Sequence, residues 1–373
     1  MKPAGIVLLG AVGFLTAFGA HMIAVGLPAF GRAHGLGYAG LGFLLASYNL
    51  AEMAIKPLAG RVSDRLGPRP VMLWGTAVFT LASLLFPVLP AALPGLRISQ
   101  GIGAGALSVS SLALLVRSFP RDLGAALGLY QALKGTGYVC APLAGGFFAR
   151  RGGFSTLFLL AGGAGSILLI LQVVFGALLE PRNPGTSASG RRLGRLWPWY
   201  LANFIDTALL GILLGFLPIR ADELGYDGRA IGFLLASASA AFLIVQPLAG
   251  AVADRLGRRA AVLWGLALGS LGTGMLGFAR GAALGAAGMA AGIGLGAAWT
   301  NSLARVGEEA HQGRLGGELG LAGSCKDAGD ILGPLSFGLI AGRGGLRAAF
   351  WVWAVLGATV VGILASAGGE ARD

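Results

Sequence analysis

Eight ionisable side chains lie inside long apolar stretches of this sequence, where a charge is expensive. Four are basic and four are acidic, so pairing among them is expected. An ionisable group at the centre of a bilayer costs about 2.5–3.5 kcal/mol on insertion scales, and such residues usually serve a function. The eight residues are Lys56, Arg97, Lys134, Lys326, Glu52, Asp206, Asp327 and Asp330.

Lysine is used in a restricted way along the chain. Every lysine after Lys2 lies within an apolar stretch, whereas the loops use arginine. Lys134 and Lys326 occupy matched positions, because each lies eight residues before a proline, Pro142 or Pro334. Lysine responds readily to burial, so we expect this pair to take part in substrate binding or coupling.

Two interpretations of the lysine pair stay open. Two lysines that face one cavity could hold an anionic solute, with Asp327 and Asp330 as proton carriers or counter-ions. Alternatively, Lys326 pairs with Asp330 at i,i+4 and only stabilises its own helix.

The remaining carboxyls are candidates for reversible protonation. Asp206 is a lone acidic residue in the middle of an apolar stretch, where the neutral form avoids the cost of desolvation. Glu52 and Lys56 are four residues apart, but the second half of the chain has Phe242 and Gln246 at the corresponding positions. The fold therefore does not require charge there, although Lys56 could simply extend to the membrane surface.

The apolar stretches that hold these residues predict membrane-spanning helices. Apolar residues make up 55% of the 373 residues and charged residues 12%. Stretches of about twenty residues suffice to cross the bilayer core, and they are continuous rather than alternating, which excludes barrel strands. We expect an all-α membrane protein with spans at 5–30, 38–60, 70–90, 95–117, 124–149, 154–177, 197–219, 229–252, 260–279, 281–305, 314–341 and 346–367.

An internal repeat divides the twelve spans into two similar halves. Residues 42–75 and 232–265 are identical at 20 of 34 positions, at an offset of 190 residues. We expect an N-terminal six-helix bundle at 1–180, a cytoplasmic linker at 181–196 that is rich in Pro, Gly, Ser and Arg, and a C-terminal bundle at 197–373. Parallel repeats of six helices with a site at their interface form one known transporter architecture.

The net charge of +12 does not indicate nucleic-acid binding, because the arginines lie in short loops between apolar stretches. Such loops mark the cytoplasmic side, so we place both termini in the cytoplasm of a protein of the plasma (inner) membrane. No metal or cofactor motif is present, and neither HExxH nor GxSxG occurs, which disfavours an enzyme. No signalling domain is visible, which disfavours a sensor.

Gly60-Arg-Val-Ser-Asp-Arg-Leu-Gly-Pro-Arg69 resembles the signature loop between helices 2 and 3 of the major facilitator superfamily, and Gly250–Arg259 repeats it. The resemblance implies that these loops hold the cytoplasmic helix ends together in one conformation; alternatively, their charges only fix the orientation. The gating candidates are Gly60, Asp64, Arg65, Gly67, Arg69, Asp254, Arg255, Gly257 and Arg258.

Two further motifs resemble those of proton-coupled drug and metabolite antiporters of the twelve-helix type. Arg97-Ile-Ser-Gln-Gly-Ile-Gly103 resembles their helix-4 motif, whose arginine is implicated in proton coupling. Residues 137–146 resemble their helix-5 motif, except that Ala141 replaces the glycine before the proline. The counterpart Gly333-Pro334 keeps that pair.

The resemblance implies a monomeric secondary transporter in the lipid bilayer that exports a small organic solute by alternating access and proton antiport. The alternative is an organic-anion symporter or exchanger that uses Lys134 and Lys326. Proton-coupling candidates are Asp206, Glu52, Arg97, Asp330 and Asp327, and substrate-binding candidates are Lys134, Lys326, Gln131, Tyr138 and Asn301.

Overall fold

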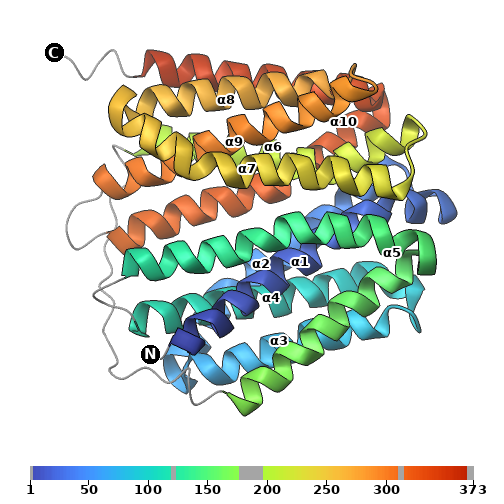
Figure 1. Ribbon diagram of the computed structural model, residues 1–373, viewed down its shortest axis with the longest axis vertical. Helices are drawn as coiled ribbons and strands as arrows, with labels where there is room; N and C mark the ends of the chain where they lie inside the picture. Colours follow the sequence, from blue (N-terminus) through green and yellow to red (C-terminus); the bar gives the residue numbers. More distant parts are fainter. Residues whose placement is uncertain (1–2, 119–122, 176–195, 310–314, 368–373) are drawn as a thin grey trace. The chain divides into compact units, whose positions relative to one another are not determined.

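The computed structural model describes residues 3–118, 123–175, 196–309 and 315–367, and within these ranges the chain is helical and contains no strand (Figure 1). The helices are α1 (Pro3–Ala33), α2 (Tyr38–Leu66), α3 (Pro68–Leu85), the short η1 (Pro90–Ala92), α4 (Leu93–Ser118), α5 (Leu123–Val174), α6 (Trp197–Glu223), α7 (Gly228–Leu256), α8 (Arg258–Met275), α9 (Ala282–Glu309) and α10 (Leu315–Ser366).

Two of these helices each contain a sharp break. Gly153 in α5 has φ 69° and Gly345 in α10 has φ 77°, and neither is a helical conformation. Glycine adopts positive φ without the steric cost that other residues incur. Each break separates two of the predicted spans, so the expected twelve-helix arrangement is confirmed.

The helices have the length and composition of a multi-pass membrane protein. Within the described residues, seven stretches are long and apolar enough to cross a membrane. The helices α3 and α8 have 18 residues each, which is close to the lower limit for a spanning helix.

The chain divides into two compact units. The N-terminal unit comprises Met1–Phe30 and Ser47–Thr186, and the C-terminal unit comprises Gly31–Ala46 and Ser187–Asp373. The first turns of α2 therefore cluster with the C-terminal unit, while the rest of α2 belongs to the N-terminal unit. The predicted linker at 181–196 lies almost entirely outside the described residues.

Glycines let neighbouring helices of each unit pack with their backbones in direct contact. A Cβ on Gly75 of α3 would lie 2.8 Å from the carbonyl oxygen of Gly103 on α4. In the C-terminal unit, a Cβ on Gly265 of α8 would lie 2.7 Å from the carbonyl oxygen of Gly294 on α9. The sequence repeat therefore corresponds to the same helix contact in both units, and the small residues serve the close packing expected in membranes.

Candidate functional site

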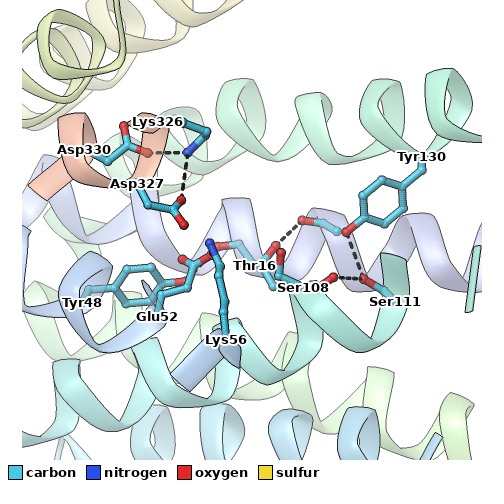
Figure 2. A network of polar contacts seen from close by, with 11 residues as sticks. Thr16, Tyr48, Glu52, Lys56, Ser108, Ser111, Tyr130, Lys326, Asp327 and Asp330 are labelled. Atoms are coloured by element: carbon cyan, nitrogen blue, oxygen red, sulfur yellow. Dashed lines mark hydrogen bonds and ion pairs between the residues drawn. The ribbon is translucent and has the colours of Figure 1, made fainter. Parts of the chain in front are cut away.

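The centre of the candidate site in the C-terminal unit is an ion-paired lysine on α10. Lys326 Nζ contacts Asp330 Oδ2 and lies 3.9 Å from Asp327 Oδ1 (Figure 2). These side chains are 32%, 21% and 15% exposed for Lys326, Asp330 and Asp327, so water can reach them. The i,i+4 pair that the sequence predicts is thus formed.

Helix α6 packs directly against this segment of α10. Thr207 Oγ1 donates a hydrogen bond of 3.0 Å to the carbonyl oxygen of Lys326. A Cβ on Gly329 would overlap with the carbonyl oxygen of Phe204, so no other residue fits without a shift of the helices. The glycine thereby brings the polar side of α6 next to the lysine.

Asp206 lies on this part of α6 and is 1% exposed. It lies within electrostatic range of Asp330 and Lys326. Neither carboxyl oxygen has a hydrogen-bond partner among the described residues. An ionised carboxylate is costly in such surroundings, so this arrangement favours a protonated carboxyl.

The polar side of α6 continues one turn earlier at Asn203, which is fully buried. Its Oδ1 accepts a hydrogen bond of 2.5 Å from Ser302 Oγ on α9. Its Nδ2 has no partner within the described part of the chain. Two neighbouring turns of α6 therefore carry buried polar groups that the described residues leave unsatisfied, which is rare in structural cores.

The N-terminal unit contains a second buried charge, Arg97 on α4, which is 4% exposed. Its Nη1 donates a hydrogen bond of 3.0 Å to Gln100 Oε1, and its guanidinium carbon lies 4.5 Å from the centre of the Tyr48 ring. Gln100 Nε2 in turn donates a hydrogen bond of 2.8 Å to Ser83 Oγ on α3. Among the described residues Arg97 has no carboxylate partner, so an amide and an aromatic ring hold this cation.

Helix α2 connects Tyr48 to the other predicted charges of this unit. Lys56 Nζ lies 3.1 Å from Glu52 Oε1, one turn beyond Tyr48 (Figure 2). The Tyr48 hydroxyl donates a long hydrogen bond of 3.4 Å to the carbonyl oxygen of Thr16 on α1. Glu52 is thus paired with Lys56 in this structure, and the ring of Tyr48 covers Arg97.

The predicted substrate residues of the first half lie on one segment of α5. Gln131 is exposed, and Lys134 and Tyr138 are half-buried. The Tyr138 ring packs against His21 of α1, with ring centres 4.6 Å apart. Lys134 and Lys326 belong to different units, so the pairing of these two lysines across a cavity stays a prediction.

Asn301, the remaining substrate candidate, lies fully buried on α9 and contacts the second signature loop. Its Oδ1 accepts a hydrogen bond of 3.3 Å from Arg258 Nη1, and its Nδ2 donates 2.9 Å to the carbonyl oxygen of Ala297. The neighbouring Arg259 donates 2.8 Å to the carbonyl oxygens of Leu364 and Ala365. A cation at a helix C-terminus is favourable, and this loop thereby ties α8 to α9 and α10.

The signature loops turn at Gly67, with φ 87°, and at Gly257, with φ 90°. Both loops therefore make a tight turn at a glycine. Gly60 makes no close approach to another helix, because a Cβ there would meet only Val109 at an ordinary 3.8 Å. Arg65 and Arg255 are exposed, Arg69 is half-buried, and the side chains of Asp64 and Asp254 lie outside the described residues.

A polar cluster at the end of α6 was not predicted from the sequence. The predicted span ends at residue 219, but α6 continues to Glu223 and Arg220 is 5% exposed. Arg220 Nη1 lies 3.3 Å from Glu223 Oε2. The i,i+3 spacing of opposite charges at the end of an apolar stretch was the available signal.

Comparison with known proteins places the chain in a family. The family model of the Major Facilitator Superfamily matches residues 9–198 and 199–367. The multidrug resistance protein Stp of Mycobacterium tuberculosis (strain CDC 1551 / Oshkosh) is 28% identical over 331 residues, which cover 72% of this chain and 62% of that protein. The chain thus spans less than two thirds of the length of this relative.

Two further comparisons agree. The quinolone resistance protein NorA of Staphylococcus aureus (strain MRSA252) is 28% identical over 211 residues, covering 54% of this chain and 53% of that protein. The inward-facing, unoccupied structure of a bacterial homolog to the human lysosomal transporter Spinster has a TM-score of 0.83 at 14% identity, covering 98% of both chains. Our chain therefore belongs to the major facilitator superfamily and is a multi-pass membrane protein.

Proposed function

We propose that this transporter exports small organic compounds, including drugs, in exchange for protons. The names of the multidrug and quinolone resistance proteins support export. The observation that carries the proton assignment is Asp206, a buried carboxyl next to an ion-paired lysine and without a hydrogen bond among the described residues. We further propose a monomer in the plasma (inner) membrane, with both termini in the cytoplasm.

The mechanism follows from competition for Lys326. In this structure Asp330 and Asp327 hold the ammonium group, and a protonated Asp206 needs no cation. When Asp206 loses its proton, its carboxylate needs Lys326 or a cationic substrate as a partner. A change in these pairs can shift the balance between two transporter conformations by a few kcal/mol, enough to reverse their populations.

The alternative of an organic-anion carrier has less support. An anion at Lys326 would have to displace two carboxylates that already neutralise it. Together with Asp206, three acidic groups surround this one lysine, and such a site favours a positive group over a second negative one.

Flux into proteoliposomes distinguishes the two functions. Vesicles with an acidic lumen should accumulate the quinolone norfloxacin faster than protein-free vesicles do, because protons leave as the drug enters. A protonophore should abolish the difference. Benzoate uptake that is driven from an acidic outside, together with no norfloxacin flux, would instead support the anion carrier.

Asp227→Asn is the matched control for substitutions of Asp206. Asp227 caps α7, where its side chain accepts a hydrogen bond of 2.9 Å from the amide of Ala230. Asparagine caps helices about as well as aspartate. Removing this carboxylate should therefore leave the response to the proton gradient unchanged.

A further inference from the structure

A hydrogen bond joins the first residue of α2 to the last residue of α6. These helix ends are the ones farthest along the two helices from the Gly60–Arg69 loop and from the predicted linker. The Tyr38 hydroxyl donates to Glu223 Oε1. We propose that this contact is a conformational latch, which holds the first turns of α2 on the C-terminal unit in one state of the transporter and opens in the other. The proposal depends on the chain being an alternating-access transporter, and not on its substrate or coupling ion.

The acceptor side of the latch is rigidly held. Arg220 donates from Nε to the carbonyl oxygen of Leu276 at 3.3 Å and from Nη2 to that of Gly277 at 3.0 Å, at the end of α8. Its third nitrogen, Nη1, donates to Glu223 Oε2 at 3.3 Å. Arg220 therefore fixes one carboxylate oxygen of Glu223, and the other faces Tyr38 in a charge-assisted hydrogen bond.

A tightly packed seam continues from Tyr38 along the same face of α2. Gly42 and Leu45 follow at i+4 and i+7, which places all three residues on one side of the helix. A Cβ on Gly42 would lie 2.7 Å from the carbonyl oxygen of Pro334 on α10. A Cβ on Gly215 of α6 would lie 2.6 Å from Leu45 Cδ1. The first two turns of α2 are thus seated against both α6 and α10.

The internal repeat shows which residues of this seam are shared by both halves and which occur in one half only. The packing residues Gly42 and Leu45 recur as Gly232 and Leu235 in the second half. The polar residues do not recur, so the helix arrangement does not depend on them. Tyr38, Glu223 and Arg220 correspond to Gly228, Ala33 and Phe30.

The latch matters for transport because α2 is divided between the two units. Residues up to Ala46 cluster with the C-terminal unit, and residues from Ser47 onward belong to the N-terminal unit. When the two units rock against each other during transport, one straight helix cannot keep both sets of contacts. Although its acceptor is charged, the hydrogen bond is exposed to water, so it favours the seated state only about fivefold and can break in each cycle.

Tyr38→Phe removes only the hydroxyl and tests the latch directly. The reporter is Ala46→Cys, a buried position at the end of the seam, in a protein that carries Cys140→Ser and Cys325→Ser. Maleimide should label this cysteine about fivefold faster when Tyr38→Phe is present. The matched control is Tyr226→Phe, since the Tyr226 hydroxyl has no hydrogen-bond partner within the described ranges. Equal labelling in Tyr38→Phe and in the control would overturn the proposal.

A disulfide gives an independent test. A Cβ on Gly342 would lie 4.0 Å from Ala39 Cβ, within the range that a disulfide requires. Ala39→Cys with Gly342→Cys should therefore crosslink on oxidation in the same cysteine-free background. Crosslinking should suppress the labelling of Ala46→Cys and stop norfloxacin flux, and reduction should restore both. Undiminished labelling of the crosslinked protein would show that the reporter reacts without opening of the seam, and would overturn the latch whatever the transported substrate is.

Discussion

Asp206 differs from the other acidic residues of the candidate site in what surrounds it. Asp330 and Asp327 share Lys326, and Glu52 has Lys56. Asp206 is more deeply buried than any of them and has no hydrogen bond within the described residues. Among these groups it is the one whose neutral form the structure accommodates best, which is why we assign the proton to it.

The ion pair on α10 makes a prediction about stability. Lys326→Met should lower the free energy of unfolding by about 1–3 kcal/mol, because it leaves Asp330 and Asp327 without their cation; partial exposure keeps the cost below that of a fully buried pair. Adding Asp330→Asn should recover part of this loss. Thermal unfolding of the purified variants measures both effects. A double variant as unstable as the sum of the two single ones would refute the pairing.

At the scale of single residues, the intramembrane charges can be predicted from the sequence, but not all of their partners can. The i,i+4 pairs of Lys326 with Asp330 and of Lys56 with Glu52 follow from helical spacing alone. The proximity of Asp206 to Lys326 does not, since it depends on how α6 packs against α10. The contact between the Tyr48 ring and Arg97 could not be predicted from the sequence either, because no sequence pattern identifies the cation that packs against an aromatic ring.

Helix packing in each unit depends on glycines at backbone contacts, and this gives an element-scale prediction. Gly329→Val should destabilise the protein strongly, because its side chain would collide with the backbone of α6 at Phe204. Gly323→Val lies on the same helix but faces open space, so it should cost much less. The melting temperatures of the two variants in one detergent provide the comparison. Equal losses would mean that helix propensity, and not packing, sets the cost.

The elements themselves were largely predictable. Long apolar stretches bounded by arginine-rich loops indicate spanning helices, and the breaks at Gly153 and Gly345 fall between predicted spans. The extension of α6 to Glu223 was missed because Arg220 looks like a loop residue by its charge. Its burial is stabilised by carbonyl groups at the end of α8, and no local pattern reveals such partners.

For the whole molecule, the repeat and the signature loops indicate the superfamily from the sequence alone, and the family match confirms it. The repeat also shows where the halves differ. Asp206 stands where the first half has Thr16, and Arg97 stands where the second half has Gly288. Acidic and basic functional groups are thus unequally distributed between the halves. The division of α2 between the two units is a further difference between the halves. The repeat alone predicts neither difference.

Proton release on drug binding is the most direct test of the proposed coupling. Norfloxacin added to weakly buffered, purified protein should release protons, because the ammonium group of the drug and the proton on Asp206 compete for the same acidic surroundings. Asp206→Asn should still bind norfloxacin, as titration calorimetry would measure, but release no protons. The same release from Asp206→Asn as from the unmodified protein would contradict the assignment.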